Sequence, residues 1–148
     1  MIRYSILLSL ISTLLLSQDV RAAEVIEGPV AAEVVRVIDG DTLKLKVHIW
    51  LGQTVEVDMR VAGIDAPELR GKCPSERALA QEARDYLASL VGGRAIRIAQ
   101  IRNDKYGGRV IADVSEPEVG DIASAMIARG LARTYDGGKR EPWCFAGS

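Results

Sequence analysis

The segment of residues 53–61 alternates between hydrophobic and polar side chains and then breaks into a short rigid loop. Its hydrophobic residues recur at every second position: Val55, Val57, Met59 and Val61. A period of two predicts a half-buried strand, which places Arg60 on the face away from the core. In the following loop, Asp65 and Glu68 lie either side of Pro67, whose fixed φ stiffens the backbone. Two acids beside an arginine suit a cation and a phosphate, and equally form a surface turn with an ion pair.

Four further segments have the composition of β-strands and are separated by turn residues. They span residues 33–38, 42–49, 94–102 and 109–114. The first three strands of the chain follow one another through short turns, which predicts an antiparallel meander.

Two helices are expected in addition to these strands. The first begins at Pro74 and ends before Gly92, with hydrophobic residues at three- and four-residue steps. The second is capped by Asp121 and runs through Arg129. Five strands with a helix between the third and the fourth predict a mainly β fold of the α+β class. We expect a five-stranded OB-type barrel with two packed helices.

The N-terminal residues have the pattern of a secretory signal peptide, with a basic start, an apolar run and small residues at its end. We expect cleavage after Ala22, an extended arm over residues 23–32 and one folded domain over residues 33–148. The apolar run is well short of the ~20 residues that a spanning helix needs, so no stable membrane association is expected after cleavage. We expect a secreted or periplasmic protein, and a monomer.

The charge balance excludes a strongly basic surface spread over the whole chain. The 148 residues carry 19 Lys and Arg against 20 Asp and Glu. Removing residues 1–22 takes away two arginines and one aspartate, which leaves 17 basic and 19 acidic side chains. Any attraction for nucleic acid must therefore be local, built from a few arginines and a cation.

Cys73 and Cys144 are the only two cysteines of the chain. Export would place them in an oxidising compartment, where an even number of cysteines favours a disulfide over free thiols. The bond would close a loop of about 70 residues and stabilise the fold by ~4 kcal/mol on the chain-entropy account. Two free thiols are the alternative. A zinc site is not expected, because two cysteines and the single histidine, His48, are fewer than four ligands.

Four motifs occur in a fixed order: Asp39-Gly-Asp41-Thr, Arg60, Asp65-Ala-Pro-Glu68 and Asp104-Lys-Tyr-Gly-Gly-Arg109. Together they resemble the thermonuclease family, also called staphylococcal-nuclease-like, over about residues 33–135. The resemblance implies a Ca²⁺-dependent nuclease with this OB-type fold. It also implies hydrolysis of single-stranded or frayed DNA and RNA with little sequence specificity, leaving 3′-phosphate ends.

The resemblance assigns the catalytic roles to Arg60, Arg109 and Glu68. Two guanidinium groups can bind the non-bridging oxygens of a phosphodiester and gain strength as charge builds there in the transition state. Glu68 is in the position of the general base that activates water. A glutamate is a weak base, so positioning and a cation must help it.

The implied metal ligands are the carboxylates of Asp41 and Asp65 and the backbone carbonyl of Ala66, which together offer the oxygen donors that Ca²⁺ prefers. The family often has threonine in place of Ala66. Because the implied ligand there is the main chain, alanine is compatible with a metal site. Asp39 is expected to tune the site from outside the ligand set.

Lys105 and Tyr106 are implied to contact the terminal phosphate and the sugar or base of the bound nucleotide. Tyr135, one residue from the register that the family predicts, is expected to supply a second aromatic wall.

Two features depart from the family. Gly108 lengthens the turn before Arg109, which then reaches the phosphate only if the turn bulges. The sequence also ends before the long final helix of the best-known relatives, and we expect the disulfide to replace its stabilising role.

Two other functions are compatible with such a barrel. A catalytically inactive OB-fold module would bind nucleic acid without cleaving it, because a fold does not determine a function. An envelope protein would use the barrel for protein contacts and would not respond to calcium. A pure binding module has no need of both arginines, the base and both metal carboxylates, and this sequence contains all five.

Overall fold

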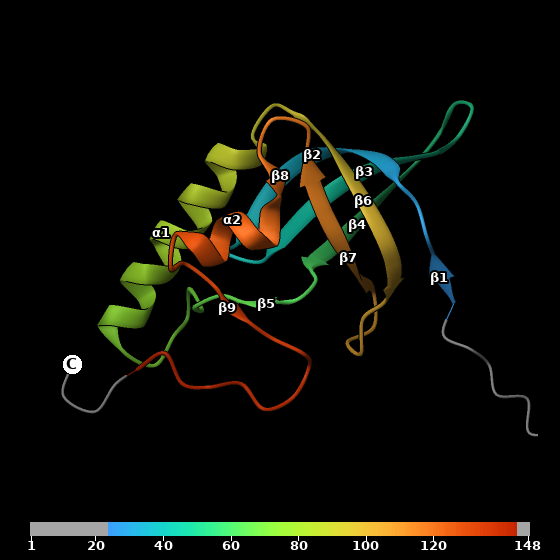
Figure 1. The fold of residues 1–148 in the computed structure, drawn as a ribbon. Helices are drawn as coiled ribbons and strands as arrows, with labels where there is room; N and C mark the ends of the chain where they lie inside the picture. Colours follow the sequence, from blue (N-terminus) through green and yellow to red (C-terminus); the bar gives the residue numbers. More distant parts are fainter. Residues whose placement is uncertain (1–23, 145–148) are drawn as a thin grey trace, which may run out of the picture.

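The computed structural model describes residues 24–144, which form a closed barrel with helices packed on one side (Figure 1). The five barrel strands are β2 (Val30–Asp39), β3 (Thr42–Trp50), β4 (Gln53–Val61), β6 (Ala95–Asn103) and β7 (Arg109–Glu116). β2, β3 and β4 form the expected antiparallel meander. β4 pairs with β7 in parallel, β7 pairs with β6, and β6 returns to β2, which closes the barrel. The predicted α+β, OB-type fold is confirmed.

The remaining elements lie outside the barrel wall. They are α1 (Pro74–Val91), α2 (Ile122–Ala128), β1 (Val25–Ile26), β5 (Ile64–Asp65), β8 (Gly120–Asp121) and β9 (Arg133–Thr134). β1 pairs with β6, and β2 already begins at Val30, so strand pairing extends into the segment expected to be an arm. The signal peptide expected over residues 1–22 lies outside the described residues, which begin at residue 24.

Both helices begin where the sequence predicts; α1 also ends there, and α2 ends at Ala128, one residue before the predicted end. Pro74 occupies the first turn of α1, and the backbone N–H of Gly92 donates to the carbonyl of Ala88 at 2.8 Å at its end. The Asp121 side chain accepts a hydrogen bond from the backbone N–H of Ser124 at 2.7 Å, which caps α2. These caps satisfy backbone groups that a helix leaves unpaired at its ends.

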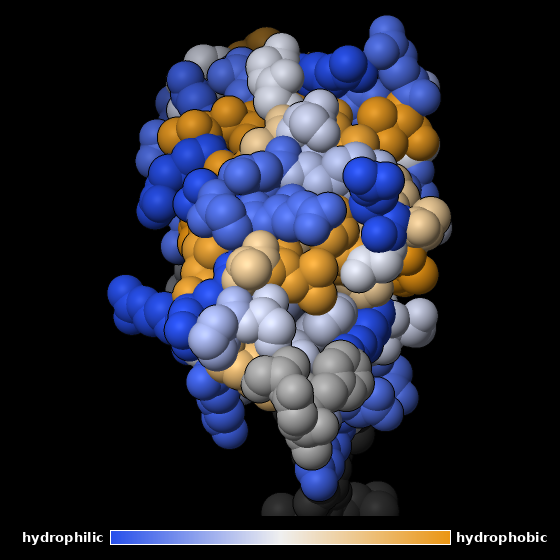
Figure 2. All heavy atoms as spheres, turned by 90° about the vertical axis from the view of Figure 1, so that its left-hand side faces the viewer, coloured by the Kyte–Doolittle hydropathy of each residue, from blue (hydrophilic) through white to orange (hydrophobic). Residues whose placement is uncertain are grey.

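The core fills the barrel and the space beneath α1. Residues from three barrel strands and from α1 are fully buried there: Leu43, Leu45, Met59, Ile96, Ile98, Leu87 and Val91. α1 packs against β2 and α2, so the helix covers one open end of the barrel. Hydrophilic side chains appear among the hydrophobic ones on the face shown in Figure 2. Within residues 24–144, no helix has the length and apolar composition needed to cross a bilayer.

The β3–β4 hairpin extends away from the barrel (Figure 1). Its tip residues Ile49, Trp50 and Leu51 are 60%, 76% and 88% exposed. Val55, which the alternating pattern predicts to be buried, is 43% exposed, so that prediction is wrong at this position. The cause is topological: β4 pairs with β7 only from Asp58 onward, so the outer half of the hairpin has no further strand beside it.

Candidate active site

One end of the barrel brings an arginine of β4 against an aspartate of the β2–β3 turn. Thr42 pairs with Arg60 across β3 and β4, which sets this proximity. Arg60 Nη2 lies 2.6 Å from Asp41 Oδ2, and Arg60 Nη1 donates to Asp41 Oδ1 at 3.1 Å. This two-point contact fixes the plane of the guanidinium group.

Small residues allow Asp41 to approach the loop that follows β4. Asp41 accepts hydrogen bonds from Thr42 Oγ1 at 2.9 Å and from the backbone N–H of Ala66 at 3.3 Å. A Cβ atom at Gly40 would lie 2.8 Å from the Cβ atoms of both Ala66 and Ala83. Glycine at this position therefore permits the turn to sit between the loop and α1.

Two buried carboxylates share the Arg60 guanidinium group. Asp41 and Asp65 are each 3% exposed, and Arg60 Nη2 lies 3.7 Å from Asp65 Oδ1. Asp39 Oδ1 accepts the backbone N–H of Asp41 at 3.1 Å and adds a third acid. Burial raises the pKa of Asp41 to about 7, Arg60 opposes the rise, and Asp39 adds to it. The site thus has more negative charge than Arg60 alone can balance.

A glutamate of α1 holds the loop that carries Glu68. Glu76 accepts hydrogen bonds from the backbone N–H groups of Glu68 at 3.4 Å and Lys72 at 3.0 Å. Gly71 lies so close that a Cβ atom there would be 2.4 Å from the Glu76 side chain. Glu76 lies in the first turn of α1, where an acid favours the start of a helix. A helix-start acid that is 8% exposed acts here as an acceptor for the preceding loop.

The β6–β7 turn places an aromatic ring and two cations at the barrel surface. Arg109 Nε donates to Asp104 Oδ2 at 2.6 Å, and the backbone N–H of Asp104 donates to the Arg109 carbonyl at 3.0 Å. The Tyr106 ring lies 5.4 Å from Lys105 Nζ and 5.3 Å from Arg109 Cζ. Gly108 has φ +82°, a conformation that accommodates the extra residue of this turn.

These groups meet around one pocket of about 430 Å³. Six of the residues that line it are predicted site residues: Arg60, Glu68, Lys105, Tyr106, Arg109 and Tyr135. The Arg60 guanidinium lies 6.0 Å from the centre of the Tyr135 ring. The longer turn therefore leaves Arg109 on the same pocket as Arg60, while Asp41, Asp65 and Ala66 lie buried beside it.

The profile described as staphylococcal nuclease homologue matches residues 58–142, more than half of the chain. The chain belongs to the staphylococcal nuclease homologue family. The chain is 34% identical over 110 residues to a micrococcal nuclease of Shigella flexneri, covering 70% of this chain and 57% of that protein. It is 28% identical over 109 residues to an uncharacterized endonuclease of Escherichia coli, covering 74% of this chain and 63% of that protein. The matched region thus spans about three fifths of each of these two relatives.

Family membership confirms the resemblance inferred from the four motifs. The structure adds two residues that the motifs did not reveal, Arg140 and Trp143. Arg140 donates from Nη1 to Glu68 Oε1 at 2.5 Å and from Nε to Asp65 Oδ1. Trp143 Nε1 donates to Asp65 Oδ2 at 3.1 Å. Partial burial would lower the pKa of Arg140, but its hydrogen bond to Glu68 and the charge of Asp65 raise it. The sequence offered one signal for Arg140: it is a basic residue close to Cys144, and the expected disulfide brings that segment to α1.

The residues present fit a hard divalent cation of the kind that the family implies. Asp41, Asp65 and the Ala66 main chain offer oxygen donors, the ligand type that such a cation prefers. Within residues 24–144, Cys73, Glu76 and Cys144 form a group whose potential ligand atoms all lie within 4.8 Å of one another. Those two sulfur atoms form a disulfide, so this group is not a metal site.

Proposed function

We propose that this protein is a nuclease that hydrolyses the phosphodiester bonds of DNA and RNA with Ca²⁺ and leaves 3′-phosphate ends. The observation that carries the proposal is the shared pocket, where Arg60 and Arg109 lie with Glu68 beside two buried carboxylates. Membership of the staphylococcal nuclease homologue family supports it. Relatives named micrococcal nuclease and endonuclease support it further.

The proposed chemistry assigns a separate task to each side chain. Arg60 and Arg109 bind the non-bridging oxygens and stabilise the charge that builds on them. Glu68 takes a proton from the water whose oxygen bonds to phosphorus. The bond from phosphorus to the 5′-oxygen breaks, and that oxygen takes a proton from solvent, leaving a 3′-phosphate and a 5′-hydroxyl.

Asp41, Asp65 and the Ala66 carbonyl would hold the cation, with Asp39 orienting the turn through its bond to the Asp41 N–H. When bound, the cation supplies Lewis-acid stabilisation of the negative charge on the phosphate. Tyr106, which is 61% exposed, and Tyr135 offer ring faces to bases. Stacking accepts every base, which agrees with low sequence specificity and a preference for single-stranded or frayed ends.

The deciding experiment compares the wild type with Glu68→Gln in the release of acid-soluble nucleotides from denatured DNA and from RNA. We expect the wild type to require Ca²⁺ and to lose activity in chelator. Glu68→Gln should lower the rate by on the order of 10²–10⁴, the usual contribution of a general base. Glu82→Gln, an exposed change of the same chemistry on α1, is the matched control and should leave the rate unchanged.

A folded wild type that binds an oligonucleotide without cleaving it under any divalent cation would favour the alternative, a catalytically inactive binding module. Full activity in chelator would contradict the proposed requirement for a cation and leave the proposed nuclease activity standing. Replacing Ca²⁺ with Mg²⁺ or Mn²⁺ identifies the ion.

The proposal also includes export of the protein. Its support is the apolar N-terminal segment together with the Cys73–Cys144 disulfide, because disulfides persist in oxidising compartments. Expression of the full chain in a bacterium should yield a mature protein beginning at Ala23, measured by intact mass in the periplasmic and culture fractions. An uncleaved chain that stays in the cytoplasm would overturn this part.

A further inference from the structure

The C-terminal tail, residues 137–144, forms one wall of the active-site pocket. Gly137 and Arg140 line that pocket together with the two arginines of the barrel. Arg140 approaches both acids of the loop after β4: it bonds Glu68 through Nη1 and Asp65 through Nε. The tail thus brings a third guanidinium group to a site that the barrel strands alone supply with two.

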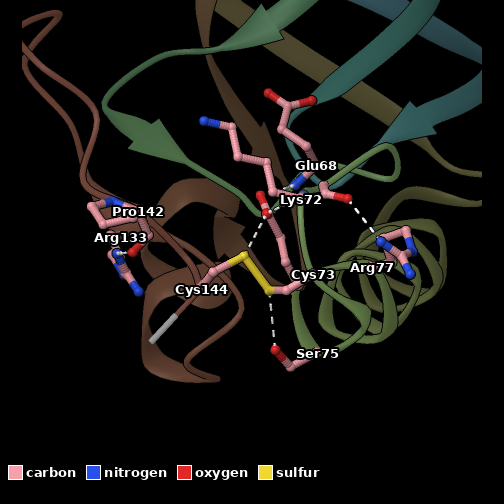
Figure 3. The surroundings of a disulfide bond; sticks show 10 residues. Glu68, Lys72, Cys73, Ser75, Arg77, Arg133, Pro142 and Cys144 are labelled. Atoms are coloured by element: carbon pink, nitrogen blue, oxygen red, sulfur yellow. Dashed lines mark hydrogen bonds between the residues drawn. A yellow bond between two sulfur atoms is a disulfide. The ribbon is translucent and has the colours of Figure 1, made fainter. Parts of the chain in front are cut away.

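The tail is fixed in place at several points. The disulfide ties Cys144 to Cys73 at the start of α1, with a Cα–Cα distance of 6.0 Å (Figure 3). Arg133 Nη1 donates to the Pro142 carbonyl at 3.1 Å, and its guanidinium lies 3.6 Å from the Trp143 ring centre. These contacts make Arg140 part of a preorganised wall, which reduces the entropy lost when a ligand binds.

Arg140 is the most accessible of the three arginines that line the pocket. Its side chain is 39% exposed, against 26% for Arg109 and 12% for Arg60. A guanidinium group has five N–H donors in a fixed fork. Arg140 directs Nε and Nη2 to Asp65 and Nη1 to Glu68, so one N–H of each nitrogen is engaged. Two of the five N–H groups then remain for an anion that enters from solvent.

We propose that Arg140 is a third phosphate-binding arginine, which contacts a backbone phosphate of the bound single strand and is held there by the disulfide-tied tail. This inference rests on the proposed function, because it assumes a nucleic-acid substrate. Arg140 binds and positions the strand, while Arg60 and Arg109 act on the phosphate that is cleaved. Without Arg140, Glu68 would lose the ion pair with Arg140, and Asp65 would keep Arg60 alone of its two arginines.

The first test measures the binding of a fluorescein-labelled single-stranded oligodeoxythymidylate in chelator across a series of salt concentrations. Loss of one phosphate contact to single-stranded DNA lowers the slope of log K against log salt by about 0.7. We expect Arg140→Gln to show that reduction and to bind on the order of tenfold more weakly. Arg140→Lys should keep the slope, since the charge remains, and lose part of the affinity. Arg84→Gln, on the outer face of α1, should change neither quantity.

Steady-state kinetics add an independent measurement. Arg140→Gln should raise KM by a larger factor than it lowers kcat, because the proposed contact serves binding, whereas its bonds to Glu68 and Asp65 also touch the chemistry. A fall in kcat with KM unchanged would overturn the proposal and show that Arg140 acts only through those two acids. An unchanged salt slope with tighter binding would overturn the proposal and identify Arg140 as a shield over the two acids. Wild-type protein that binds no oligonucleotide at any salt concentration would instead contradict the proposed nucleic-acid substrate itself.

The second test asks whether the tether matters. In a Cys73→Ser/Cys144→Ser background, Arg140→Gln should have little further effect on oligonucleotide binding, because the free tail no longer holds the guanidinium over the pocket. The two changes should therefore be strongly non-additive. Circular dichroism confirms that each variant is folded. Full additivity would show that Arg140 works without the disulfide and would overturn that half of the proposal.

Discussion

At the scale of single residues, Arg60 connects the fold to the proposed chemistry. Its guanidinium contacts Asp41 at two points and donates to the Ile64 carbonyl at 3.1 Å, so one side chain aligns the turn, the strand and the loop. Lysine has a single ammonium group and cannot make the planar two-point contact. Lysine at position 60 would keep the positive charge but lose the two-point contact that aligns the turn, the strand and the loop.

Arg60→Lys is therefore expected to lower kcat on the order of 10²–10³, the cost of losing a preorganised donor. Urea unfolding should also show a lower free energy of unfolding. The decrease should be smaller than the roughly 3–5 kcal/mol lost when one partner of a buried ion pair is removed, because a cation remains beside Asp41. Arg84→Lys on the surface of α1 is the control and should change neither quantity. Wild-type kcat in Arg60→Lys would show that the two-point contact is dispensable.

Prediction from sequence succeeded for residues whose positions follow from local pattern. The alternation of β4 and the turn before β3 set the register that brings Arg60 to Asp41, so the two residues lie together as the sequence predicts. Arg140 and Trp143 could not be found in this way, because a tail without periodicity reaches the site only through a long-range disulfide. Glu76 was missed for a related reason: its acceptor role depends on the path of the loop before the helix.

At the scale of elements, the β2–β3 turn depends on the absence of a side chain at Gly40. A Cβ atom there would clash with Ala66 in the loop after β4 and with Ala83 in α1. We expect Gly40→Ala to destabilise the protein by about 1–3 kcal/mol, as overpacking does, and to weaken Ca²⁺ binding by moving Ala66 from Asp41. Thermal unfolding and calorimetric titration with Ca²⁺ measure the two effects.

Gly107→Ala is a matched control for stability, because a Cβ atom at Gly107 meets nothing within 4 Å. It should leave the unfolding temperature nearly unchanged. Equal loss of stability in both variants would mean that Gly40 is needed for its backbone conformation and not for the close packing of the turn against Ala66 and Ala83.

The turn between β7 and β8 gives an expectation for pH. Burial alone would raise the pKa of Glu116, but the backbone N–H groups of Val119 and Glu118, each donating at 2.8 Å, hold that pKa below its usual value, with Arg94 adding to the effect. The stabilisation is then fully present above the pKa of an unfolded glutamate and disappears as pH falls through the lower folded pKa. Glu116→Gln should flatten the fall of unfolding free energy below about pH 4.5. An unchanged pH profile in that variant would contradict the assignment.

At the scale of the whole molecule, the Cys73–Cys144 disulfide joins the tail to the start of α1, in addition to the peptide chain itself. The strands close the barrel through the parallel β4–β7 pair, and the helices cover it, without help from the tail. Beyond β9, the described tail has no helix or strand of its own, so its position depends on side-chain contacts and on the disulfide. We therefore expect stability and site geometry to respond together when the disulfide is removed.

The bond closes a loop with a sequence separation of 71 residues, for which loop-closure entropy predicts about 4 kcal/mol. Reduction should lower the melting temperature by on the order of ten degrees, with the fold intact at 25 °C because the barrel core is independent of the tail. Calorimetry with and without a phosphine reductant measures the shift. Cys73→Ser/Cys144→Ser should melt at the reduced temperature and show no response to reductant. A wild-type melting temperature that reductant leaves unchanged would mean that the Arg140, Trp143 and Arg133 contacts hold the tail by themselves, and that the bond contributes nothing measurable to stability.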